Sequence, residues 1–362
     1  MVAGVKIIVL SSLDTSCRDA GLKHLQRHHP EAVTLSYDFI EGNRLVRRVS
    51  GNAPAEYGEA VLEHPCIGCA VKYEIFPSIQ RLAPRDPDAI MLLGLPATWH
   101  SGSVLQTLAE KLEATGISID SNALSFDPTD LEDQMWDRHT LWESGFSSME
   151  QDLRTPGEYF FTELMQADTL IPVEGMQTQL LEPKDSPRRD GGADFSAGLE
   201  LAQHLAPHAT VCHHENTLGS FSYEAVQQRT KAGHIPPLPH HGASGRVPIR
   251  LHAERPLHPQ RFREALSELA ASCTCLRGRL WVASALSERV AIGGAGPRIW
   301  MENTGLWSAE IAASELLLYG SEHESTQITK VFEDCQVTGK ELQELITTAP
   351  PTASNNHLQG GE

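Results

Sequence analysis

The sequence predicts an α/β fold, with a parallel-sheet domain at 1–215, a linker at 216–245 and a smaller α+β domain at 246–347. In the first half, strand-like apolar runs alternate with amphipathic helix-like segments, the pattern of a parallel sheet with right-handed crossovers. The run "DAIMLLGL" (88–95) is continuously apolar, as a strand buried on both faces requires. The stretch "TKAGHIPPLPHHGASG" (230–245) is rich in proline, glycine and histidine, which is typical of a linker.

The first domain opens with a buried strand at 5–11 and a helix at 17–29. Further strands are predicted at 32–39, 88–95, 117–128, 167–173 and 209–214, with helices at 70–83, 102–115, 158–166 and 196–205. In the second domain, 247–269 reads as a strand followed by a helix, and 339–349 as a last helix. Strand-like segments lie between them at 276–284, 289–302 and 326–335, and the tail at 348–362 is predicted to be disordered.

The composition excludes several classes of protein. A formal net charge of -18 argues against unassisted binding to DNA, RNA or anionic membranes, all of which are polyanions. The N-terminal stretch is too short for a signal peptide, and no apolar run reaches the roughly 18 residues of a membrane span. Seven scattered cysteines do not form a secreted disulfide framework, so we expect a reducing cytoplasm with metal use.

The loop after the first strand stands where a phosphate-binding loop would lie, but it lacks both glycines of that motif. Within Ser16, Cys17, Arg18 and Asp19, the arginine replaces the expected lysine and the aspartate replaces the magnesium-binding hydroxyl. A carboxylate about 4 Å from a phosphate costs about 4 kcal/mol at an effective dielectric of about 20, or roughly three decades of affinity. We therefore predict that the loop no longer binds GTP or Mg²⁺. The alternative is that the loop still binds a nucleotide, either through the helix N-terminus or in an unconventional mode through Arg18.

A candidate metal site is carried by Cys66 and Cys69, whose C-x-x-C spacing allows two thiolates to bind one Zn²⁺. His64 could supply a third ligand. His100, after the "GLPATW" turn, is expected at the same edge of the sheet and is a further candidate. The alternative is a buried or redox-active cysteine pair.

The remaining cysteines have more ordinary interpretations. Cys212, His213 and His214 end a predicted strand, and a solvated loop is favoured over a metal site there. Cys273 and Cys275 are expected on one face of a core strand. Cys17 and Cys335 are expected to be single structural cysteines.

Two small basic groups are candidate contact surfaces. Arg255, His258 and Arg261 open a predicted helix, where a structural corner is favoured over a contact with a partner. The stretch "RLVRRVSG" (44–51) carries three arginines, which fit a protected strand edge better than a surface for ribosomal RNA.

Several stretches share a pattern with one known family: "HPCIGCAVKYEIFPSIQRL" (64–82), "GLPATW" (94–99) and above all "ERPLHPQRFREAL" (254–266), followed by "RGRLWVAS" and "GPRIWMENTGLW". Together they resemble the CobW family of zinc-linked, P-loop GTPase-like proteins. The resemblance extends to about residue 347. It implies a P-loop NTPase-like first domain and a CobW C-terminal domain.

The departures from the family pattern point to one branch of it. The guanine-reading Asn-Lys-x-Asp would occupy Val173, Glu174, Gly175 and Met176, and the metal motif lacks its middle cysteine. With the altered first loop and the stretch at 37–51, this resembles the actinobacterial branch that recruits a ribosome hibernation factor under zinc starvation.

Three functions follow from this reading. The first is a non-catalytic adaptor that brings a ribosome hibernation factor to the ribosome. The second is a zinc metallochaperone or insertase that is driven by GTP hydrolysis and serves a zinc-dependent client protein. The third is zinc storage or transfer without nucleotide. The altered loop and the lost guanine motif favour the first.

Overall fold

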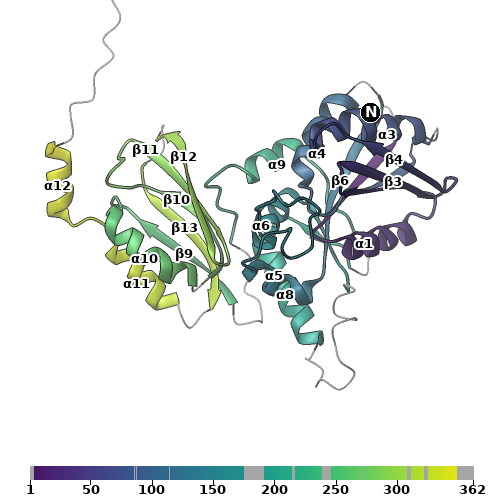
Figure 1. Cartoon of the computed structure of the whole chain (residues 1–362). Coiled ribbons are helices and arrows are strands. Elements are labelled where there is room, and N and C mark those ends of the chain that lie inside the picture. Colours follow the sequence, from purple (N-terminus) through teal and green to yellow (C-terminus); the bar gives the residue numbers. More distant parts are fainter. Residues whose placement is uncertain are drawn as a thin grey trace, which may run out of the picture.

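The computed structural model contains two sheets, each with its own helices (Figure 1). It describes residues 4–348, except 85, 87, 114, 175–190, 214–216, 239–245, 272, 308–310 and 322–324. The first sheet ends with β8 at Val211 and the second begins with β9 at Arg246. The predicted tail lies outside the described residues, apart from Thr348, which ends the last helix.

The first sheet has eight strands in the order β4-β3-β2-β5-β1-β6-β7-β8. In chain order they span Lys6–Ser12, Val33–Ile40, Arg44–Gly51, Glu56–Val61, Ile90–Gly94, Ser118–Phe126, Thr169–Pro172 and Thr210–Val211. Six neighbouring strands pair in parallel, and β3 and β4 add an antiparallel hairpin at one edge. The predicted α/β fold with a parallel sheet is therefore confirmed.

Helices cover both faces of this sheet because the apolar residues of its strands alternate between them. In β1, Ile8 and Leu10 face α1 and contact Leu22, whereas Ile7 and Val9 face α3 and α4. The helices are α1 (Thr15–His28), α2 (Ile67–Ala70), π-helix η1 (Val71–Ile75), α3 (Phe76–Leu82), α4 (Ser101–Leu112), α5 (Pro128–Trp136), α6 (Pro156–Gln166), α8 (Gly191–Leu205) and α9 (Tyr223–Arg229).

The second sheet is antiparallel, with strand order β12-β11-β10-β13-β9. Its strands β9 to β13 span Arg246–Ala253, Cys273–Leu280, Glu288–Ala295, Arg298–Leu306 and Ser314–Ser321. Its helices are α10 (Pro259–Ala271), α11 (Ser325–Asp334) and α12 (Gly339–Thr348). Helices α10 and α11 cover one face, and the other face turns toward α5 and α6 (Figure 1). This confirms the smaller α+β domain.

Two sequence predictions about elements are wrong. The segment 326–335 is helix α11 and not a strand, because Ile328 and Phe332, four residues apart, are both buried in the core of the second domain. The predicted linker at 216–245 contains helix α9, whose Val226 is buried and which packs against α6. Residues 239–245 of that linker lie outside the described residues.

Cys273 and Cys275 are both buried, as predicted, but they face opposite sides of β10. Cys273 joins the core under α10 and α11, whereas Cys275 joins the apolar cluster shared with the first domain. The pairing of β10 with β13 shifts register between these two cysteines. A bulge of this kind breaks the alternation on which the prediction of one common face depended.

The two domains share an apolar cluster. Tyr319 of β13 is buried in the same cluster as Phe160 of α6, and Phe161 packs edge-on against Trp300 of β12 with ring centroids 4.7 Å apart. No helix within the described ranges is long and apolar enough to cross a membrane.

Candidate functional site

The connection between β1 and α1 consists of only Leu13 and Asp14. Leu13 is 1% exposed and packs in the core. The Asp14 carboxylate caps α1, accepting hydrogen bonds from the Cys17 backbone N–H at 2.8 Å and the Ser16 hydroxyl at 2.6 Å. Burial, and then the Asp14 charge, raise the pKa of the Cys17 thiol far above its usual value. Backbone donors that a phosphate would need are thus partly occupied.

Arg18, which the sequence pattern aligns with the lysine of a phosphate loop, is 1% exposed and points into the protein. Its Nη2 lies 2.8 Å from Asp19, and its Nη1 lies 2.7 Å from Asp38 and donates to the Tyr37 carbonyl at 2.6 Å. Burial pushes the pKa of Asp38 upward, but Arg18 and Arg48 hold it below its usual value. The guanidinium charge is therefore neutralised within the protein.

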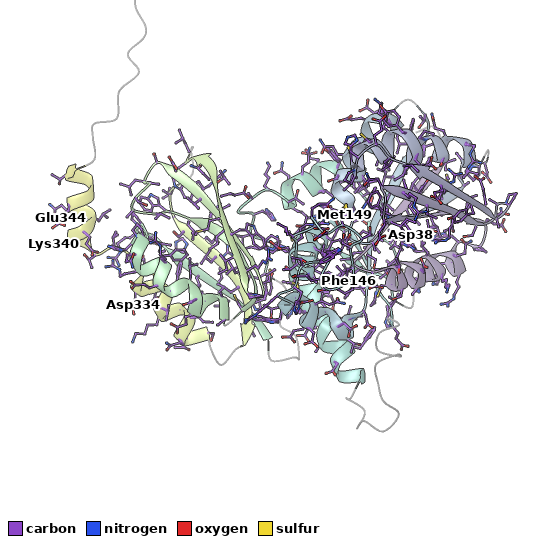
Figure 2. The ribbon with its side chains drawn as sticks, in the orientation of Figure 1. Asp38, Phe146, Met149, Asp334, Lys340 and Glu344 are labelled. Carbon is purple, nitrogen blue, oxygen red and sulfur yellow. The ribbon has the colours of Figure 1, made fainter. Side chains whose placement is uncertain are left out.

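A groove of about 940 Å³ lies beside this network, between α1, the β2–β3 face and the loop at 145–149. Asp38 and Arg48 line one part of it, and Trp99, Phe146 and Met149 line another. Figure 2 labels Asp38, Phe146 and Met149 in this region of the first domain. Residues 97–99, which follow β5, line the part of the groove at the carboxyl edge of the sheet, where ligand crevices usually lie in open α/β sheets.

His64, Cys66 and Cys69 form the group of side chains best suited to a metal ion in the described part of the chain. Their ligand atoms all lie within 4.8 Å of one another. The His64 Nε2 and Cys69 Sγ atoms are 3.8 Å apart. Tetrahedral Zn²⁺ with ordinary Zn–N and Zn–S bonds places such a pair about 3.6 Å apart, so the observed spacing fits zinc.

The hydrogen bond between the two thiols shifts their pKa values in opposite directions. The Cys69 thiol, and then the backbone N–H groups of Cys69 and Gly68, hydrogen-bond to Cys66 and lower its pKa. The same contact raises the pKa of Cys69. The two cysteines are partly exposed and His64 is exposed. Cys66 is therefore the first thiolate offered to an arriving cation, from a position open to solvent.

The metal-ligand helix is held to the β3–β4 hairpin. Cys66 caps α2, which continues through the π-helix η1 into α3. Short π-helical segments within α-helices are frequent at functional sites. Glu74 of η1 forms an ion pair with Arg47 of β3, which also binds Glu56 of β4 and the Ser78 hydroxyl. A movement of the cysteine helix would strain this network.

The structure does not bring His100 into the three-residue group. Its Nδ1 lies 3.1 Å from a carboxylate oxygen of Glu163, and its ring stacks on Tyr159. Glu163 is fully buried and also accepts from the Ser101 N–H at 2.7 Å and the Ser11 hydroxyl at 2.8 Å. His100 is thus engaged at the start of α4 by a carboxylate that sequence reasoning missed, since a glutamate in an amphipathic helix normally reads as solvated.

Cys212 lies apart from this group. It is buried, with its Sγ 3.5 Å from His24 Nε2, and His213 packs near the ring of Phe195. His214 lies outside the described residues, as do Gly175 and Met176 of the predicted guanine-reading positions.

The basic groups are engaged within the protein. Arg261 pairs with Glu341 of α12 at 3.0 Å and donates to the Gln336 carbonyl at 2.8 Å, while the His258 N–H donates to the Cys335 carbonyl. Arg255 is exposed. The arginines of β3 all have carboxylate partners: Arg44 pairs with Glu59, Arg47 with Glu56 and Glu74, and Arg48 with Asp38.

Comparison with known proteins identifies the second domain. The model of the cobalamin synthesis protein cobW C-terminal domain matches residues 248–336. These residues therefore form a CobW C-terminal domain, in agreement with the sequence resemblance.

Curated relatives and solved structures also match. The zinc chaperone Rv0106 of Mycobacterium tuberculosis and the uncharacterized protein Mb0109 of Mycobacterium bovis are each 25% identical over 265 residues, 70% of this chain and 61% of the relative. The chain thus spans about three-fifths of the length of these curated relatives. A Zn(II)-bound YjiA GTPase from E. coli matches with a TM-score of 0.36 and 10% identity over 92% of this chain and 99% of that one.

Proposed function

We propose that this chain, which carries a CobW C-terminal domain at residues 248–336, is a zinc-binding protein that acts in zinc homeostasis. The observation that carries the proposal is the convergence of His64, Cys66 and Cys69 at zinc-ligand spacing. The similarity to a protein named as a zinc chaperone supports it.

Zn²⁺ in this proposal is a transferred ion. Three ligands leave one tetrahedral position for water or for a ligand of a client protein, whereas structural zinc sites use four protein ligands. The exposure of the three residues suits exchange of the ion with another protein. The hydrogen bonds that lower the pKa of the Cys66 thiol favour capture, because a thiol must lose its proton to bind zinc.

The test is a Zn²⁺ titration of metal-stripped full chain in competition with a chelator. We expect one zinc per chain, and a loss of roughly a hundredfold or more in affinity on Cys66→Ser or Cys69→Ser. His64→Ala should weaken binding, and affinity should fall with pH as the thiols become protonated. His252→Ala, which changes an exposed histidine of β9, is the matched control.

His100→Gln separates the three-ligand site from the predicted four-ligand one. If the site has three ligands, the His100→Gln variant should bind zinc as tightly as the parent chain. A large loss of zinc affinity in this variant would show that His100 is a fourth ligand. Equal affinity of the Cys66→Ser and His252→Ala variants would contradict the proposed site.

We further propose that the chain works without a GTP cycle. The connection after β1 has only two residues, and the guanidinium of Arg18 is already paired with Asp19 and Asp38. Both features support this proposal, because Arg18 is not available to bind a phosphate. Titration with GTP·Mg²⁺, with and without Zn²⁺, should show no binding up to millimolar nucleotide. Micromolar binding would instead favour the zinc metallochaperone driven by GTP hydrolysis.

The role of ribosome hibernation adaptor remains a proposal based on the sequence resemblance and on the altered first loop. The negative net charge of the chain fits a basic protein partner better than bare RNA. Co-sedimentation of the chain with ribosomes, with and without a hibernation factor and zinc, tests it. If the chain pellets with ribosomes only when the hibernation factor is present, the adaptor role is supported. If the chain pellets under no condition, the adaptor role is contradicted and the zinc-handling proposal remains.

A further inference from the structure

A second cavity, of about 380 Å³, lies between α6 and the face of the second sheet that is turned toward the first domain. It is separate from the zinc ligands and from the first loop, and its volume falls within the range of small-molecule sites. Phe161, Ile292 and Trp300 form an apolar wall, and Arg277 of β10 lies within the cavity lining.

Arg277 is 7% exposed, and the described part of the chain gives it no carboxylate partner. Its Nη2 donates to the Phe161 carbonyl and its Cζ lies 3.5 Å from the centroid of the Phe161 ring. Its Nε is buried without a hydrogen-bond partner, and burial lowers its pKa. A buried cation of this kind is unfavourable unless an anion compensates it.

Other basic groups line the same cavity. Lys231 is exposed, Arg154 is paired with Asp152 at 2.6 Å, and His234 has its pKa lowered by burial and by the charges of Arg277 and Arg229. The two carboxylates of the lining are Glu158, which is bound by Arg298, and the exposed Glu302. Within the described residues, Arg277 and Lys231 are therefore the two permanent cations of the lining without a carboxylate partner, in a chain whose net charge is -18.

We propose that this interdomain cavity binds the oxyanion group of a small molecule, a carboxylate or a phosphate, with Arg277 as its principal cation and Lys231 at its mouth. The aromatic wall formed by Phe161 and Trp300 would contact the less polar part of the ligand. Because α6 and the second sheet both line the cavity, a bound anion would hold the two domains together. The proposal does not depend on zinc binding.

The test is calorimetric titration of the full chain with inorganic phosphate and with malonate, at constant ionic strength set with chloride. We expect saturable binding of at least one of them, and the preferred anion identifies the ligand as a phosphate or a carboxylate. Arg277→Met should weaken binding by about tenfold or more, as loss of a charged hydrogen bond predicts. Met should keep the fold, because an apolar side chain is tolerated where an unpaired charge is not.

Lys231→Ala is the second variant, since Lys231 is exposed and its loss leaves the core intact. It should weaken binding by about threefold. Lys340→Ala on α12, at the far end of the molecule, is the matched control and should have no effect (Figure 2). The imidazole proton signals of His234 should also titrate at higher pH with phosphate or malonate bound, because a nearby anion favours imidazolium.

No saturable binding of either anion, or binding that both cavity variants retain, would overturn the proposal. Loss of zinc affinity alone leaves it unaffected, and loss of anion binding alone leaves the zinc proposal unaffected.

Discussion

Arg18, which the sequence pattern aligns with the lysine of a phosphate-binding loop, forms ion pairs inside the protein. Its guanidinium joins α1 to β2 through Asp38 and is closed off from solvent. Loss of Asp38 would leave the buried guanidinium with Asp19 as its remaining carboxylate partner, and Asp19 is half exposed, so this loss is costlier than loss of an exposed ion pair. Arg18 therefore helps to hold the start of α1 against β2.

Asp38→Asn tests this network through the pH dependence of stability. The pKa of Asp38 is depressed in the folded chain, so its contribution is present above its unfolded pKa and is lost as pH falls through the folded pKa. We expect the variant to lose about 2 kcal/mol of unfolding free energy at pH 7. Below about pH 4 its stability should fall less steeply than that of the parent chain.

Denaturant unfolding at a series of pH values measures this difference. Asp120→Asn is the matched control, because Asp120 pairs with Lys6 at 3.5 Å and both side chains are substantially exposed. It should change stability little at any pH. An equal loss in both variants would show that the Asp38 pair contributes no more than a surface one.

The site residues differ in how far the sequence could predict them. His64, Cys66 and Cys69 lie within six positions of one another, so local spacing alone brings their ligand atoms together. The partner of His100 is Glu163, 63 residues away, and only the packing of α6 against α4 brings them together. Contacts of that range leave no periodic pattern in a single sequence.

At the scale of elements, the six parallel strands of the first domain were predictable from their apolar or alternating runs, whereas the edge strand β4 (Glu56–Val61) was not predicted. Helix α11 was not, because Thr326, Ile328, Thr329 and Val331 are β-branched residues that favour strands. Packing against α10 through Ile328 overrides that preference. The bulge in β10 similarly depends on pairing with β13, which no local pattern records.

Helix α6 positions Glu163 and supports both domains, and its start is fixed by a capping box. The Thr155 hydroxyl accepts from the Glu158 N–H at 3.3 Å, and the Glu158 carboxylate accepts from the Thr155 N–H at 2.7 Å. Thr155→Ala should therefore cost about 1 kcal/mol of unfolding free energy.

Denaturant unfolding at pH 7 measures the effect of Thr155→Ala. Thr162→Ala in the middle of the same helix is the control, because alanine has the higher helix propensity there and the change should be close to neutral. If the two variants lose the same free energy, the cap contributes nothing specific.

At the scale of the whole molecule, the two sheets do not behave as independent cores. The apolar cluster of α5, α6 and α8 also contains Cys275, Ala295 and Tyr319 of the second domain. The sequence predicted both domains but not this contact, because each domain follows its own local pattern and the surface between them joins residues more than a hundred positions apart. A shared cluster of this kind predicts cooperative unfolding of the full chain.

Phe161→Ala tests that cooperativity. Phe161 of α6 packs on Trp300 of β12 and under Arg277 of β10, so its removal takes away the aromatic contact between the domains. We expect calorimetry of the parent chain to show one transition, and the variant to lose about 2 kcal/mol and unfold in two steps. Met301→Ala, on the exposed side of β12, should keep one transition. Two transitions in the parent chain would mean that the shared cluster, together with the Arg277–Phe161 hydrogen bond and the Arg298–Glu158 ion pair, is too weak to couple the unfolding of the two domains.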